Sequence, residues 1–131
     1  MIGWYSPANE DTIIRVAIDT QDELVMILEK LRSSAPLSQI PAISLEWGET
    51  SALTFAQVPG GAVLVWSPNE DLSFHTVGNR VGSETVTCTI GGTESEFPIQ
   101  CVIPMEIAIR AAGVFLSSGV PGIPYLQWEQ D

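Results

Sequence analysis

Asp71, Ser73 and His75 lie close together in the sequence, and His75 is the only histidine. A serine hydroxyl becomes a nucleophile when a histidine removes its proton and an acid orients that histidine. This geometry is assembled in three dimensions, and neighbours in one extended segment do not form it reliably. We therefore expect His75 to be a loop or surface residue, and we expect the chain not to be an enzyme.

Metal and cofactor motifs are absent from the sequence. One histidine and two cysteines cannot build a typical zinc site, and neither C-x-x-C nor H-E-x-x-H occurs. Asn69-Glu70-Asp71 lacks the spaced ligands and central glycine of a calcium loop. No phosphate loop or dinucleotide fingerprint is present. We expect no metal and no cofactor, and with sixteen acidic residues a plausible carboxylate pair carries little information.

The two cysteines are Cys88 and Cys101. Two cysteines do not make a disulfide framework, and in a reducing compartment they are most simply buried thiols. A structural disulfide between them remains the alternative.

Acidic charge dominates the composition, with 16 acidic and 5 basic residues, a formal charge of −11 and a pI near 4.2. From Ser33 to Pro104 the only basic residue is Arg80, whereas the acidic residues there are Glu46, Glu49, Glu70, Asp71, Glu84, Glu94 and Glu96. This is the inverse of a nucleic-acid-binding pattern. We expect a basic partner and no direct contact with nucleic acid or an anionic membrane. The alternative is that acidity only provides solubility.

Apolar stretches are too short to cross a membrane. The longest are 60–66 and 105–116, against the roughly 20 residues that a spanning helix needs. The first residues also lack the basic and apolar regions of a signal peptide. We therefore expect a cytoplasmic protein.

Alternating and helical patterns define the elements. Residues 12–18 predict a strand, and the capping box Thr20-x-x-Glu23 begins a helix that ends at 33–36. Further strands are expected at 43–47, 53–58 and 62–66, with a hairpin turn at Pro59-Gly60-Gly61. A second helix begins at Pro104 and ends at Gly119, and a short strand at 125–129 carries Trp128. In this helix Glu106 and Arg110 have the spacing of an ion pair.

Gly91-Gly92 predicts a two-residue turn joining strand 85–90 to the residues after it. That register puts Thr85, Thr87, Thr89, Glu94 and Glu96 on one face. Val86, Cys88, Ile90 and Phe97 then form the core side. Together these elements predict an α+β fold, an antiparallel β-sheet with two main helices packed on one face, as a single domain over residues 1–131.

The stretch from Ile103 to Asp131 reads IPMEIAIRAAGVFLSSGVPGIPYLQWEQD. Its proline-initiated, alanine-rich helix, the following Phe-Leu-Ser-Ser-Gly and the late tryptophan before an acid resemble the first-numbered immunity family of bacterial polymorphic toxin systems. Residues 45–55 and 60–67 resemble that family more loosely. The resemblance implies an immunity protein, or antitoxin, which protects the cell from a toxin encoded next door. Several members are similar to antidotes of cytosine deaminase toxins that act on DNA.

A toxin that acts on nucleic acid must present a basic groove, which an antidote can block with carboxylates. We therefore expect the partner to be a cognate toxin domain, a deaminase first and a nuclease second. One candidate contact is the loop 67–71 with its neighbours, and the other is the Thr/Glu face of the glycine hairpin. The candidate contact residues are Trp66, Glu70, Asp71, Phe74, His75, Glu84, Glu94 and Glu96. The alternatives are ordinary solvated surfaces and, for the whole chain, an acidic adaptor or structural protein unrelated to toxins.

Overall fold

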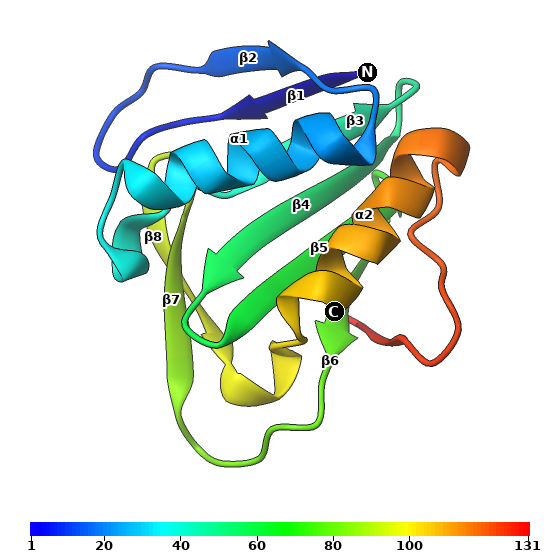
Figure 1. Cartoon of the computed structure of the whole chain (residues 1–131). Helices are drawn as coiled ribbons and strands as arrows, with labels where there is room; N and C mark the ends of the chain where they lie inside the picture. The colour runs from blue at the N-terminus through cyan, green and yellow to red at the C-terminus, as the bar shows by residue number, and fades with distance from the viewer.

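Seven strands form one antiparallel sheet in the computed structural model, which describes all residues from Met1 to Asp131 (Figure 1). The strand order across the sheet is β2-β1-β3-β4-β5-β6-β9. Their bounds are β1 Ile2–Tyr5, β2 Ile14–Ala17, β3 Ile43–Trp47, β4 Ser51–Val58, β5 Gly61–Asn69, β6 Leu72–Val77 and β9 Gln127–Gln130.

Two helices, α1 (Gln21–Ser33) and α2 (Met105–Ser118), cover the same face of this sheet (Figure 1). The Thr20 hydroxyl accepts a hydrogen bond from the Glu23 amide at 3.2 Å, so the capping box begins α1 as expected. Both helices bury apolar side chains against the sheet in one core, among them Leu24, Leu28 and Phe115. The α+β fold with two helices on an antiparallel sheet is confirmed. Neither helix is long and apolar enough to span a membrane.

A separate hairpin of β7 (Thr85–Ile90) and β8 (Thr93–Pro98) packs against the other face of the sheet. Its register is the predicted one, with Ile90 opposite Thr93. Val86 and Cys88 bury against Ala56 and Val63 of the sheet and form a second core. Two short 3-10 helices flank it, η1 (Leu37–Gln39) and η2 (Ile99–Cys101).

Five local predictions need correction. Strands β1 and β6 were not predicted, so His75 lies half-buried in a strand instead of in a loop or on the surface, and β9 begins at Gln127 instead of residue 125. Thr89 is buried, because its strand also bonds to the segment after η1, where the Ala42 amide donates to the Thr89 carbonyl at 2.7 Å. Glu106 and Arg110 form no ion pair within 4.0 Å.

Candidate partner-binding surfaces

The predicted contact residues lie in four places instead of two. Glu70 and Asp71 form the β5–β6 turn, and Trp66 and Phe74 lie on the side of the sheet that the helices cover. His75 points to the opposite face, and Glu84, Glu94 and Glu96 belong to the hairpin region. The structure therefore separates residues that the sequence grouped together.

The β5–β6 turn is much tighter than the expected loop 67–71. Strand β5 continues to Asn69 and β6 starts at Leu72, so only Glu70 and Asp71 lie outside the strands. The Asn69 side-chain oxygen accepts hydrogen bonds from the amides of Asp71 (2.8 Å) and Leu72 (3.1 Å). The pairing of β5 with β6 shifts its register between Trp66 and Asn69. Pro68 lies in this stretch and has no backbone N–H to donate to the sheet. The turn thus holds two exposed carboxylates on a fixed backbone.

Trp66 and Phe74 form an aromatic cluster with Trp128. The Trp66 and Phe74 rings stack with centroids 5.7 Å apart, and the Trp66 and Trp128 rings meet edge to face at 6.0 Å. Trp66 and Trp128 pack on the core that the helices share with the sheet. These half-buried rings offer less surface to a partner than the β5–β6 turn offers.

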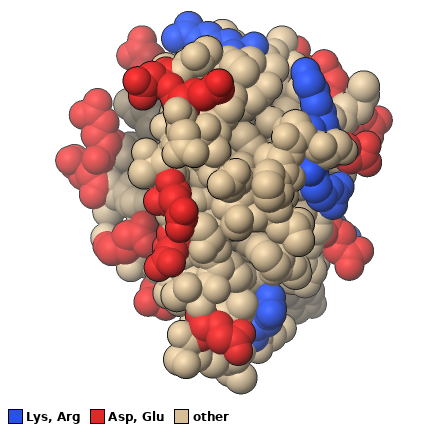
Figure 2. All heavy atoms as spheres, turned by 90° about the vertical axis from the view of Figure 1, so that its left-hand side faces the viewer, with Lys and Arg blue, Asp and Glu red and all other residues tan.

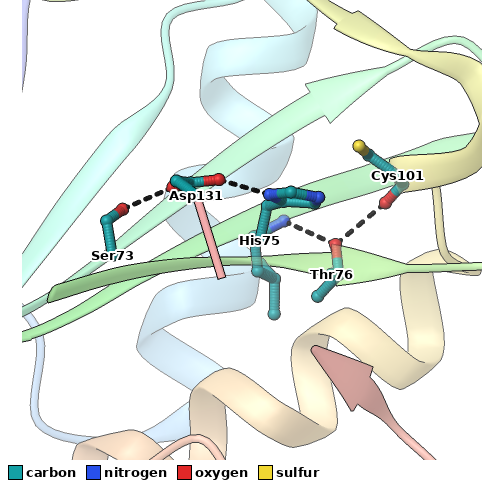
Figure 3. A network of polar contacts seen from close by, with 6 residues as sticks. Ser73, His75, Thr76, Cys101 and Asp131 are labelled. Carbon is teal, nitrogen blue, oxygen red and sulfur yellow. Dashed lines mark hydrogen bonds and ion pairs between the residues drawn. The ribbon is translucent and has the colours of Figure 1, made fainter. Parts of the chain in front are cut away.

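His75 is joined to Ser73 through Asp131 (Figure 3). The Ser73 hydroxyl donates to one Asp131 carboxylate oxygen at 2.6 Å, and His75 Nδ1 contacts the other. Because the acid lies between them, the His75 imidazole does not contact the Ser73 hydroxyl, and the Ser-His-Asp order of a serine nucleophile is not formed. Asp71, the acid nearest in sequence, instead lies in the exposed turn.

The Asp131 carboxyl has a pKa below its usual value. Partial burial acts to raise that pKa, but the hydrogen bonds from Ser73 and His75 and the charge of His75 lower it by more. Sequence reasoning missed Asp131, because only the β6–β9 pairing brings it beside Ser73.

Two free, buried cysteines lie in the second core. Burial raises the pKa of the Cys88 thiol to about 11. Burial, followed by the charges of Glu129 and Asp131, raises the pKa of Cys101. The Cys101 carbonyl accepts a hydrogen bond from the buried Thr76 hydroxyl at 2.8 Å, which ties η2 to the sheet (Figure 3). No three His, Cys, Asp or Glu side chains are placed to hold a metal ion.

Glu94 and Glu96 point away from the second core. They pair with Thr89 and Thr87 across the hairpin, and both are exposed. Residues two apart on a strand share a face at a spacing of about 7 Å, so the two carboxylates lie side by side. Glu84 is exposed just before β7, and its carbonyl accepts from the Ile99 amide at 3.0 Å.

Register across the sheet adds two acidic residues that sequence reasoning left out. Glu129 pairs directly with His75, and Glu46 pairs with Ala52, so both share the face on which the hairpin packs. Glu46 accepts a hydrogen bond from the Trp4 indole at 3.0 Å, and both carboxylates are exposed. In the sequence, Glu46 and Glu129 only alternate with core residues in short strands. That pattern did not place them on this face, because the β1–β3 and β6–β9 pairings were not predicted.

Most carboxylates have no cationic partner. Of the sixteen acidic residues, only Asp19 and Asp131 form ion pairs, with the Met1 amino group and with His75. No lysine or arginine takes part. Figure 2 shows carboxylates over the left half and at both margins of its face, with basic side chains at the top and in the right half. The protein therefore carries its negative charge uncompensated at close range.

The chain was compared with known proteins. The family model for immunity protein Imm1 matches residues 14–129, which extend from the first residue of β2 into β9. Curated proteins give no match. Since the family model covers most of the sequence, the chain belongs to the Imm1 family of immunity proteins.

Proposed function

We propose that this immunity protein neutralises a toxin domain that acts on nucleic acid, most simply a cytosine deaminase, by covering the toxin's basic substrate groove with carboxylates. An immunity function, with a cognate toxin as partner, follows from the family. The choice of groove comes from charge. A deaminase that takes a single-stranded or flipped base must attract the phosphate backbone around its pocket.

The observation that carries the proposal is that most acidic side chains have no cationic partner within the protein. An acid already paired with an arginine must give up that pair before it binds a toxin. Here only Asp19 and Asp131 are paired. Opposite potentials speed encounter, and close charge pairs then slow dissociation.

Two surfaces can present these carboxylates. The first is the hairpin face with Glu94 and Glu96, and Glu84 beside it; the second is the turn of Glu70 and Asp71. The hairpin packs on β5 at Val63, whereas the turn follows Asn69 at the far end of that strand. Strand geometry separates these two points by roughly 20 Å. We expect the surfaces to make separate contributions, with Trp66, Phe74 and His75 supporting the turn from β5 and β6.

Growth rescue tests the immunity function. The gene directly upstream should encode a large protein with a toxic C-terminal domain. We expect co-expression of that domain with residues 1–131 as one immunity domain in the cytoplasm to restore growth and to yield a stoichiometric complex. Cells that still die would contradict the proposal for that pair. An acidic adaptor unrelated to toxins would give neither rescue nor complex.

The chemistry and the occlusion need a second assay. Purified toxin on single-stranded DNA produces uracil if it is a cytosine deaminase and strand breaks if it is a nuclease. If the carboxylates cover the substrate groove, inhibition should be competitive with DNA and should weaken as salt is raised. Inhibition that is independent of DNA concentration would instead indicate binding away from the groove.

A further inference from the structure

One hollow on this acidic protein has a basic lining. It has a volume of about 390 Å³ and opens beside α2, between the chain after β6 and the chain before β9. Its fourteen lining residues include Arg80 and Arg110, two of only five basic residues, and none of the sixteen acidic residues. We call it the arginine groove. It comprises residues 77–80, 102–104 and 124–127 with Gly60, Ile107 and Arg110.

Both guanidinium groups are available to a ligand. One Arg80 nitrogen donates to the Pro59 carbonyl at 3.4 Å, which orients the side chain and leaves its other donors free. Arg110 is exposed on α2 and forms no ion pair, even with Glu106 one turn earlier. Arginine binds carboxylates through two parallel hydrogen bonds, which lysine cannot match. The pair therefore suits an anionic group of planar shape.

Apolar surface flanks the arginines. Ile107 and Leu126 line the groove, and Tyr125 at its edge is fully exposed. The Tyr125 backbone has φ of 71°, in the left-handed region that bulky side chains rarely adopt. Strained backbone of this kind concentrates at functional sites. Exposed tyrosine next to arginine is also the composition of binding hot spots.

We propose that the arginine groove binds an acidic segment of the toxin, with a carboxylate held by Arg80 and Arg110 and a neighbouring apolar side chain against Ile107 and Tyr125. This inference rests on the proposed function. A free anion approaching a protein of charge −11 is repelled at long range. A segment of a toxin already bound through its basic groove is held at high local concentration and does not meet that barrier.

This site deepens the function because it supplies specificity. Carboxylates alone would attract any basic domain. A second contact of opposite sign fits only a toxin that has an acidic segment at the matching position, and it would repel a partner that is basic there. The groove would thus fix the orientation of the complex and select the cognate toxin.

The test compares two double variants in calorimetric titration with the catalytically inactivated toxin domain. R80Q/R110Q removes both groove arginines, and the control R15Q/R32Q removes two exposed arginines outside the groove, so both make the protein equally more acidic. Long-range attraction to a basic toxin should rise equally in both. We expect R80Q/R110Q to bind more than tenfold more weakly and R15Q/R32Q to bind as tightly as the parental chain or more tightly.

Thermal midpoints should be nearly equal in the two variants, since all four arginines are exposed, none forms an ion pair, and the one hydrogen bond of Arg80 to the Pro59 carbonyl is long and exposed. If R80Q/R110Q binds as tightly as R15Q/R32Q, the arginine groove is not part of the interface. In that case the proposed function stands, because the parental chain still binds. A parental chain that neither binds nor inhibits the toxin overturns both proposals.

Discussion

The imidazole of His75 contacts the carboxylate of Asp131 across the β6–β9 pair, although 56 positions separate them in the chain. The same carboxylate accepts a hydrogen bond from the Ser73 hydroxyl, and the Asp131 amide donates one to the Ser73 carbonyl at 2.9 Å. Side-chain and backbone bonds together therefore attach β9 to the sheet edge. Ser73, His75 and Asp131 resemble a catalytic group by residue type, but their contacts attach the last strand to β6.

The contact between His75 and Asp131 predicts a pH-dependent coupling free energy between these two side chains. The folded-state pKa of Asp131 lies below the usual aspartate value of 3.8. Its contribution to stability is therefore complete above that value and is lost as the pH falls through the lowered folded-state pKa. Because the carboxylate is 45% exposed, we expect a coupling free energy of at most about 1 kcal/mol.

A double-mutant cycle with His75→Gln and Asp131→Asn, measured by urea unfolding, checks this coupling. The coupling should be present at about pH 6 and should decrease at about pH 3. Ser73→Ala, measured in the same way, separates the contribution of the hydroxyl from that of the imidazole, because Ser73 also donates to this carboxylate and lowers its pKa. A coupling free energy that is equal at both pH values would contradict the assignment.

Substitution of Gly119 is expected to cause a large loss of stability. It caps α2 with φ of 78°, and a Cβ atom there would lie 2.6 Å from the Trp47 ring. Gly119→Ala would combine left-handed strain with this clash, so we expect a loss of about 2–4 kcal/mol. Gly91→Ala is the control, because Gly91 has φ of 60° with nothing within 4 Å of the added carbon. Gly91→Ala should lose only about 1 kcal/mol of stability, from the strained backbone. Equal losses of stability in the two variants would show that Trp47 does not restrict Gly119.

Cysteine reactivity distinguishes the free thiols from the disulfide that the sequence left open. With a pKa of about 11, only about one Cys88 in a thousand is a thiolate at about pH 8. We therefore expect iodoacetamide to modify native Cys88 very slowly and both cysteines quickly in urea without reductant. Mass spectrometry of the digested protein measures each site. Cysteines that stay unmodified in urea until a reductant is added would indicate a Cys88–Cys101 bond instead.

Local patterns in the sequence were sufficient for most elements. The Thr20–Glu23 capping box, the Gly91-Gly92 turn and the Gly119 cap each specify backbone geometry within a few residues, and each is found where it was predicted. Strand β1 has only four residues and includes Gly3, whose missing side chain leaves room for Ile18 and Leu45. A strand so short has no periodicity to detect, and its position depends on packing.

The candidate sites were less predictable, because they depend on contacts between distant parts of the chain. Asp131 reaches Ser73 only through the β6–β9 register, and Arg80 reaches the same hollow as Arg110 only when α2 packs on the sheet. Local spacing favoured Glu106 as the partner of Arg110, and that ion pair does not form. The acid that contacts His75 is Asp131, which no local spacing indicated. Charge and family resemblance predicted the kind of partner, whereas the surfaces required the fold.

The turn and the hairpin give the clearest test of acidic occlusion. Glu70→Lys with Asp71→Lys should weaken toxin binding by more than tenfold and leave the thermal midpoint nearly unchanged. Both side chains are exposed and unpaired, and the turn is held by the Asn69 side chain and the two following amides. Glu94→Lys with Glu96→Lys tests the hairpin in the same way.

Glu29→Lys with Glu49→Lys is the control for both variants, because it makes the same change in net charge on the exposed surface of α1 and in the exposed β3–β4 turn. Titration calorimetry at low and high salt measures all three. Salt should weaken the parental complex more than a complex that has lost its acidic contact, since fewer charge pairs remain to be screened. If a lysine variant binds the toxin as tightly as the control does, the surface that it alters is not part of the interface. If both the turn and the hairpin variants bind like the control, the toxin is not held by these carboxylates, and Glu46 and Glu129 on the sheet face become the residues to change next.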